Sequence, residues 1–190
     1  MKNKNIIIIA FLILAIVQLA VPIQMIFHNN AILSTGKLYK FRAQPIDPYD
    51  AFRGKYIYLN FDESTIYTKD SIVENESYVA VLGTDKKGFA KIVKLRRKSI
   101  PQEDYITIKS LYSYRVSEND KRFFVNLNFP FNRYYMNEYK APKAEESYNS
   151  SVRDTSKNVY ALVAVKNGEA IIKDVMIDGI SIKDYVKKRK

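Results

Sequence analysis

The sequence predicts a mainly β protein, in which a single N-terminal transmembrane helix precedes an antiparallel all-β body built from two similar β units. Three observations lead to this prediction. Residues 6–27 form an apolar run without a charge, apolar and polar residues alternate in several stretches after residue 37, and glycine-containing turn sequences separate two pairs of these stretches. Alternation with period two is typical of a strand with one buried face. We therefore divide the 190 residues into an anchor over 1–30, a β domain over 31–186 and a basic tail over 187–190.

The apolar run is long enough to cross a bilayer. Its 22 residues, Ile6 to Phe27, would extend about 33 Å as a helix, against a hydrocarbon core of about 30 Å. Lys2 and Lys4 precede it, which favours a cytoplasmic amino terminus, although basic residues also follow the run. The alternative is a cleaved signal peptide, whose apolar region would be shorter and would end in a small-x-small site, where this chain has Gln18. We therefore expect an uncleaved, single-pass anchor in the cell membrane and a β domain on the periplasmic or extracellular side.

Strand-like stretches follow one another through the rest of the chain. They cover residues 39–42, 56–61, 78–82, 89–95, 105–116, 123–129, 159–165 and 170–177. The turn sequences at 84–88 and at Asn167-Gly168 predict two hairpins. The stretch Ala141 to Ser151 is predicted equally as a short helix or as a loop, because Pro142 and several Ser and Asn residues lie in it.

An internal repeat indicates the two β units. Residues 55–61 align with 123–129, share Leu-Asn-Phe, and are followed in both places by a loop and a hairpin. The repeat predicts units over 37–100 and 105–182, the second of which carries an insertion within 133–155. The alternative is that strand-rich sequences resemble each other by chance.

Composition excludes several kinds of site. The chain has no Cys, which excludes disulfides, thiolate metal sites and cysteine catalysis, and its one histidine excludes a two-His metal site. His28 directly follows the apolar run and is expected to be an interfacial polar residue rather than a catalyst. The sequence therefore predicts no metal site, no cofactor and no catalytic residue.

The net charge of +11 indicates anionic partners only weakly. More than half of the excess lies at the two ends, in Lys2, Lys4 and 187–190. The basic run within 86–98 resembles a nucleic-acid patch, but a body outside the cytoplasm would meet anionic lipid instead, and a solvated charged face is the simpler interpretation. Nucleic acid is therefore not the expected partner.

The segment that ends at Phe61 carries a motif. Its Gly54, Tyr56 and Leu59 resemble the signature of the GDYXXLXY family of membrane-anchored bacterial proteins. Lys55 stands where the signature has Asp, and Phe61 stands where it has the final Tyr. The reversed charge means that a family role for that carboxylate does not apply here.

The resemblance extends over nearly the whole chain. A second block looks like one of the family's and contains Arg133, Tyr134, Tyr135 and Glu138. The last hairpin looks like its closing block, with Gly168, Ile177, Asp178 and Gly179. The resemblance implies a single-pass envelope protein of uncharacterised activity, and a polytopic membrane protein as a partner, because the family is often encoded beside one.

The residues before the first motif admit two interpretations. Pro48 keeps Asp47 extended, Asp50 and Arg53 are spaced to pair in a turn, and Gly54 is able to take a positive φ. The segment is either a shaped loop that leads into a strand or a recognition loop. The candidate interaction residues are Asp47, Asp50, Arg53, Gly54, Tyr56, Leu59, Arg133, Tyr134, Tyr135 and Glu138.

The expected function is that of a non-enzymatic accessory or interaction partner of a membrane complex. Its expected contacts are membrane lipid, through Ile6–Phe27, and a polytopic membrane protein. The alternative is an envelope hydrolase that uses the paired carboxylates of Asp47 and Asp50, since such pairs divide acid and base roles. An enzyme would need a concave pocket into which one of these carboxylates points.

Overall fold

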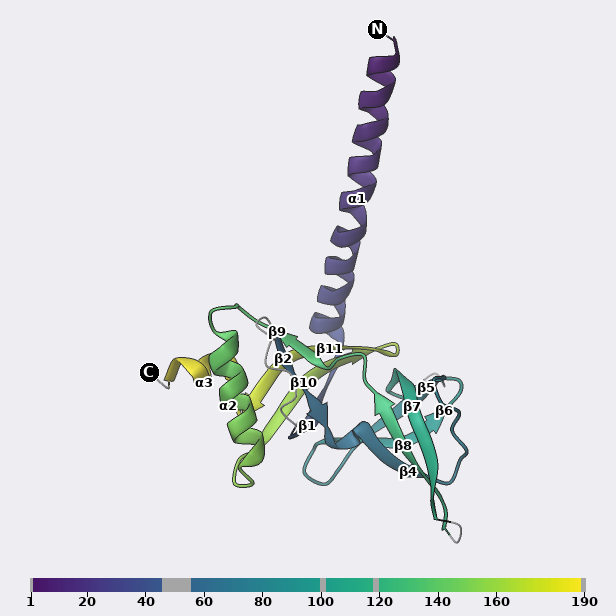
Figure 1. Cartoon of the computed structure of the whole chain (residues 1–190), viewed down its shortest axis with the longest axis vertical. Helices are drawn as coiled ribbons and strands as arrows, with labels where there is room; N and C mark the ends of the chain where they lie inside the picture. The colour runs from purple at the N-terminus through teal and green to yellow at the C-terminus, as the bar shows by residue number, and fades with distance from the viewer. Residues whose placement is uncertain (1, 46–55, 100–101, 118–119, 189–190) are drawn as a thin grey trace.

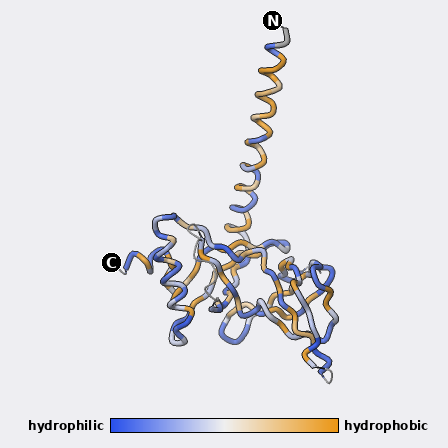
Figure 2. Tube along the Cα trace, in the orientation of Figure 1, coloured by the Kyte–Doolittle hydropathy of each residue, from blue (hydrophilic) through white to orange (hydrophobic). Residues whose placement is uncertain are grey.

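A long helix rises from a β body (Figure 1). Helix α1 (Lys2–Thr35) is continuous, with Pro22 inside it. Its apolar side chains are exposed, from Ile6 at 64 % to Phe27 at 71 %. Figure 2 shows that the helix is hydrophobic over most of its length. By length and composition α1 is able to cross a membrane, which confirms the predicted long apolar helix. The structure is a computed structural model, and it describes residues 2–45, 56–99, 102–117 and 120–188.

The first five-stranded sheet has the order β12-β11-β10-β1-β3, with every neighbouring pair antiparallel. Its strands are β1 (Lys37–Gln44), β3 (Asn60–Phe61), β10 (Val159–Lys166), β11 (Glu169–Ile177) and β12 (Ile180–Ser181). The predicted turn joins β10 and β11, where Asn167 and Gly168 have φ of 51° and 86°. β1 pairs with β10 from Lys37 opposite Val165, so the beginning and the end of the body lie side by side.

The second five-stranded sheet has the order β4-β8-β7-β5-β6, also antiparallel. Its strands are β4 (Thr65–Thr68), β5 (Ser77–Thr84), β6 (Ala90–Arg96), β7 (Tyr105–Ser117) and β8 (Asp120–Asn128). The predicted hairpin joins β5 and β6. Asp85 stabilises its turn, because the Oδ1 atom accepts the backbone N–H groups of Lys87 and Phe89, both at 2.8 Å. A short 3₁₀ helix, η1 (Asp62–Ser64), leads from the first sheet into the second.

Two short strands and two helices complete the described body. Strands β2 (Tyr56–Tyr58) and β9 (Arg133–Tyr135) form a two-stranded antiparallel sheet. Helices α2 (Ala141–Arg153) and α3 (Ile182–Lys188) lie together at the end of the body opposite the second sheet (Figure 1). The stretch predicted equally as helix or loop is thus helical. Its buried residues recur at helical spacing and are Ala141, Ala144, Ser147, Tyr148 and Ser151.

The two sheets do not correspond to the two halves of the sequence. The first sheet takes β1 and β3 from the predicted unit 37–100 and the rest from the unit 105–182, and the second sheet mixes the same two segments. Isolated bridges from Lys40 to Phe89 and from Ile106 to Gly168 also connect the two sheets. The body therefore contains two antiparallel β units in space, each built from both halves, and the duplication of the sequence stays a prediction.

Four phenylalanines form one cluster in the core. Phe41 of β1, Phe61 of β3, and Phe129 and Phe131 of the β8–β9 connection are each at most 5 % exposed. Their ring centroids are 5.1 to 5.8 Å apart in tilted or edge-on pairs. Such pairs each contribute about 0.5–1.5 kcal/mol beyond their buried area. The cluster joins strands that are far apart in the sequence.

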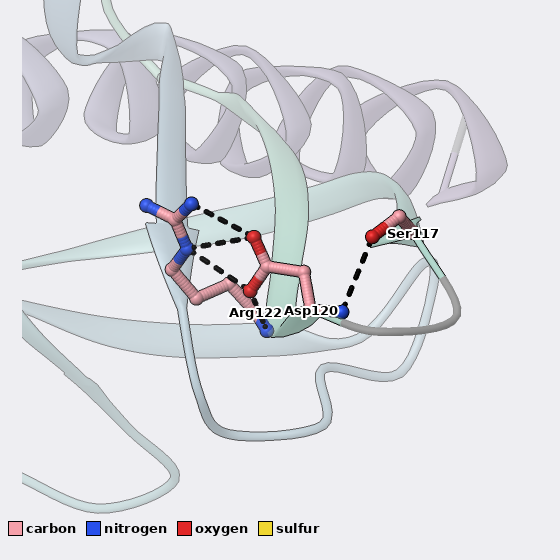
Figure 3. A network of polar contacts seen from close by, with 3 residues as sticks. All are labelled: Ser117, Asp120 and Arg122. Atoms are coloured by element: carbon pink, nitrogen blue, oxygen red, sulfur yellow. Dashed lines mark hydrogen bonds and ion pairs between the residues drawn. The ribbon is translucent and has the colours of Figure 1, made fainter.

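The outer end of the β7–β8 hairpin is held by a polar network (Figure 3). The guanidinium of Arg122 donates from Nη2 to the Asp120 carboxylate at 2.7 Å and from Nε at 3.1 Å. The hydroxyl of Ser117 accepts the backbone N–H of Asp120 at 3.2 Å. All these contacts lie within the hairpin, so we assign the network a structural role.

The C-terminal end of α1 contacts the β10–β11 hairpin. Ile32 is 3 % exposed, so the last turns of the helix bury a side chain against the body. His28 Nε2 lies 2.6 Å from the Glu169 carboxylate, and Lys166 donates to the Thr35 hydroxyl at 2.7 Å. These contacts fix where the helix leaves the body.

Candidate functional site

The structure joins the two blocks that the sequence singled out. Strand β2 of the first block pairs with β9 of the second, with Tyr56 opposite Tyr135, Ile57 opposite Tyr134 and Tyr58 opposite Arg133. Leu59 extends the pairing, since its N–H donates to the carbonyl of Asn132 at 2.9 Å. Four of the predicted interaction residues, Asp47, Asp50, Arg53 and Gly54, lie outside the described residues.

Alternation divides the two strands into a buried and an exposed face. Ile57, Leu59 and Tyr134 are 0, 2 and 5 % exposed and belong to the core. Of the predicted contact residues, Leu59 and Tyr134 therefore position the strands and do not themselves form the surface. The exposed face carries Arg133 and Tyr135.

An aromatic and cationic cluster occupies this exposed face. The rings of Tyr56 and Tyr135 lie 5.5 Å apart across the strand pair, and the Arg133 guanidinium lies 5.2 Å from the centre of the Tyr56 ring. Tyr135 is 65 % exposed, whereas Tyr56 is partly buried. We call Tyr56, Arg133 and Tyr135 the β2–β9 surface. Glu138 is exposed in the segment that follows β9.

The buried face connects the strand pair to the rest of the body. The Tyr134 hydroxyl donates to Asp174 of β11 at 2.8 Å, and Lys183 of α3 lies 5.5 Å from the Tyr134 ring centre. Burial raises the pKa of the Tyr134 hydroxyl well above its usual range, and the hydrogen bond to Asp174 raises it further. This tyrosine is thus a neutral donor at physiological pH, and it is suited to holding β9 against β11.

A hollow of about 450 Å³ opens beside the β2–β9 surface. Its walls come from α1, β9, β11, α3 and the segment before β9. They consist of Asn29, Pro130, Phe131, Arg133, Tyr134, Tyr135, Ala170, Ile171, Ile172, Lys173 and Lys183. The hollow therefore combines cationic side chains with an apolar wall, and it reaches the lower end of α1.

A second polar cluster, which sequence reasoning missed, lies at the start of β1. Asp104 accepts hydrogen bonds from Lys37 at 2.5 Å and from the Tyr39 hydroxyl at 2.7 Å. The hydrogen bond from Lys37 holds the pKa of the Asp104 carboxyl below its ordinary value, and the bond from Tyr39 lowers it further. The partners are more than sixty residues apart in the chain, so no local pattern could reveal them.

Metal ligation is not supported by the described side chains. Among them, no group of three or more His, Asp or Glu residues is placed to hold an ion. Of three described hollows, two place Lys or Arg beside Asp and Glu, and one places them beside Tyr and apolar side chains. The residues described at the β2–β9 surface offer ring stacking, cation–π contact and hydrogen bonding.

The fold and the site define a class: a mainly β body carried on one long apolar N-terminal helix, with its two distinctive sequence blocks paired as neighbouring strands. The chain belongs to the GDYXXLXY protein family, whose sequence model matches residues 18–175. The match includes both blocks and Gly168 of the closing hairpin, while Ile177, Asp178 and Gly179 lie beyond it. No curated protein and no solved structure matches the chain.

Proposed function

We propose that this chain is a single-pass protein of the bacterial envelope, anchored by α1, and that it acts as a non-enzymatic accessory of a membrane complex. The support for anchoring is the exposed apolar surface of α1, which is unfavourable in water and is matched by lipid. Lys2 and Lys4 at the start of the helix support a cytoplasmic amino terminus and a body on the periplasmic or extracellular side.

The pairing of β2 with β9 carries the proposal of a contact surface. Two blocks that are widely separated in the sequence combine there into one exposed cluster of Tyr and Arg. Tyr and Arg are enriched among the residues that dominate binding energy at protein interfaces. Tyr135 is 65 % exposed, so its ring is accessible to a partner.

The location of this surface favours a membrane protein as the partner. The hollow beside it includes Asn29, two residues after the end of the apolar run. A partner on this surface would therefore lie close to the bilayer. The extramembrane loops of a polytopic protein are available at this depth.

Co-purification tests the proposal. The intact protein, extracted from native membranes in mild detergent, is expected to retain one polytopic protein. The double variant Arg133→Ala/Tyr135→Ala should recover it more than tenfold less well, since truncation of hot-spot residues costs about 2 kcal/mol or more each. The matched control is Tyr114→Ala/Arg115→Ala, an exposed Tyr–Arg pair on β7 of the other sheet.

Two results would contradict the proposal. One is wild-type protein that retains no specific membrane partner, and the other is equal recovery by the double variant and the control. Circular dichroism establishes that both variants are folded. After either result, hydrolysis of envelope glycan by Asp47 and Asp50 becomes the hypothesis to test.

A further inference from the structure

The hollow beside the β2–β9 surface lies at the depth of lipid headgroups when α1 spans a bilayer. The apolar run ends at Phe27, and Asn29, which lines the hollow, is two residues or about 3 Å further along the helix. The polar layer on each side of a bilayer is about 5–7 Å deep, which is half the difference between the full thickness of the bilayer and that of its hydrocarbon core. A wall of the hollow therefore faces this layer.

Three cations from three elements converge on the hollow. They are Arg133 of β9, Lys173 of β11 and Lys183 of α3, and all three side chains line it. The partners that the structure shows for Arg133 and Lys183 are tyrosine rings, of Tyr56 and Tyr134. Asp174 is near, but its Oδ1 accepts from the Tyr134 hydroxyl and from the Val175 N–H, both at 2.8 Å. No carboxylate lines the hollow in the part of the chain that the structure describes, so its described walls carry a positive charge.

The remaining walls suit the rest of a lipid molecule. Ile171 and Ile172, both partly buried, supply apolar surface beside the cations. The segment that joins β9 to α2 lies on the side of the body from which α1 leaves (Figure 1), and it carries Tyr139, which is 86 % exposed. Tyrosines with an exposed hydroxyl are enriched at the membrane interface. A soluble anion would use only the charges, whereas a phospholipid would use the charges and the apolar wall.

We infer that this hollow binds the phosphate of an anionic phospholipid from the leaflet next to the body. Arg133 presents the planar fork that suits phosphate oxygens, and Lys173 and Lys183 add point charges. The bound lipid would fix the orientation of the body on the bilayer and with it the direction of the β2–β9 surface. The inference rests on the proposed membrane anchoring but does not require a protein partner.

Photolabelling of the intact protein in vesicles tests the inference. The probe is phosphatidylglycerol with a photoreactive group next to its phosphate, and the same group on phosphatidylcholine serves as the zwitterionic comparison. Peptide mass spectrometry should find the label on residues 130–135 and 170–173, several-fold more from phosphatidylglycerol. Inorganic phosphate in excess should leave most of this labelling in place, because it cannot use the apolar wall.

Variants identify the side chains responsible. Lys173→Ala and Lys183→Ala should each reduce labelling about fivefold, which corresponds to about 1 kcal/mol for a basic residue near an anionic surface. Both lysines are exposed, so these variants should fold even if Arg133→Ala does not. The matched control is Lys94→Ala/Lys121→Ala, which removes two exposed lysines from the second sheet and should leave labelling unchanged.

Three results would overturn the inference. They are equal labelling by the two lipids, labelling confined to other segments, and loss of labelling in inorganic phosphate, which would show a site for free phosphate. An alkaline carbonate wash of the membranes shows whether the protein is anchored. If the protein is retained but the lipid does not label it, only the lipid site fails. Protein that the wash releases is not anchored, and that result contradicts both the lipid site and the proposed function.

Discussion

At the scale of single residues, Tyr134 connects the exposed surface to the core. Its ring is buried, its hydroxyl donates to Asp174, and its backbone belongs to the same strand as Arg133 and Tyr135. One side chain thus ties β9 to β11. The orientation of the β2–β9 surface depends on this contact.

Removing the hydroxyl of Tyr134 should destabilise the body without creating a cavity in the core. Tyr134→Phe keeps the ring and loses a hydrogen bond to a carboxylate, which is worth about 1.5–3 kcal/mol. Denaturant unfolding measures this difference. Tyr135→Phe, at an exposed tyrosine, should change the free energy of unfolding by less than about 0.5 kcal/mol. Equal effects of the two variants would contradict the assigned role of Tyr134.

The Tyr134→Phe substitution should also alter how the free energy of unfolding depends on pH. The pKa of the Tyr134 hydroxyl is raised in the folded state above the ordinary tyrosine value of 10.0. The unfolded chain therefore loses this proton first, and the stabilisation is complete below pH 10 and declines as the pH rises above it. The difference in free energy of unfolding between wild type and Tyr134→Phe should be constant up to about pH 10 and shrink above it. A difference that shrinks on acidification instead would contradict this account.

At the scale of elements, the junction between α1 and β1 depends on a close backbone approach. A Cβ atom at Gly36 would lie 2.5 Å from the Ile32 carbonyl oxygen and 3.1 Å from that of Val165. Both neighbours are backbone atoms, so neither is able to rotate away. The glycine is therefore required where the helix passes directly into the sheet.

Gly36→Ala should destabilise this junction. Because the backbone must shift, we expect a loss of about 1–3 kcal/mol, in the range of overpacking in a well-packed site. Thermal unfolding of the intact protein in detergent measures it. Ser34→Ala, in the last turn of the same helix, is the control and should have little effect. If both variants unfold at the same temperature as wild type, the close approach is not essential.

Element prediction from the sequence succeeded where the signal was local. The apolar run, the β5–β6 turn at 84–88 and the β10–β11 turn at Asn167-Gly168 all depend on neighbouring residues, and all are present. Local patterns could not decide whether 141–151 was a helix or a loop. The decision came from packing, because α2 buries Tyr148 completely against the body.

At the scale of the whole molecule, two interleaved sheets share one aromatic core. Phe129 contacts Phe41 and Phe61 of the first sheet, and it follows directly after β8 of the second. The two sheets should therefore unfold together. Sheets that were independent repeat units would unfold separately.

Phe129→Ala should weaken both sheets at once. Truncation of a buried Phe costs about 3–5 kcal/mol. Hydrogen exchange should show that protection in β10 and in β7 falls by the same free energy. Loss of protection in the second sheet alone would mean that the phenylalanine cluster does not couple the unfolding of the two sheets.

Strand order and site assembly depend on contacts that the sequence does not display. The pairing of Lys37 with Val165, and of Tyr56 with Tyr135, joins segments that no local pattern relates. Each block nevertheless carries a motif that could be recognised in the sequence, and the structure pairs the two blocks, while their role as an interaction site stays a prediction. Only the structure shows that Arg133 and Tyr135 are exposed on β9 while Tyr134 between them is buried.

Crosslinking from position 135 in living cells determines whether the β2–β9 surface contacts a membrane protein. A photoreactive phenylalanine analogue replaces Tyr135, which is 65 % exposed, and a matched variant carries it in place of Tyr114, which is 54 % exposed on the other sheet. We expect one dominant crosslink to a polytopic protein from position 135 and none from position 114. Crosslinks that are absent at position 135, or identical from both positions, would contradict the proposed contact.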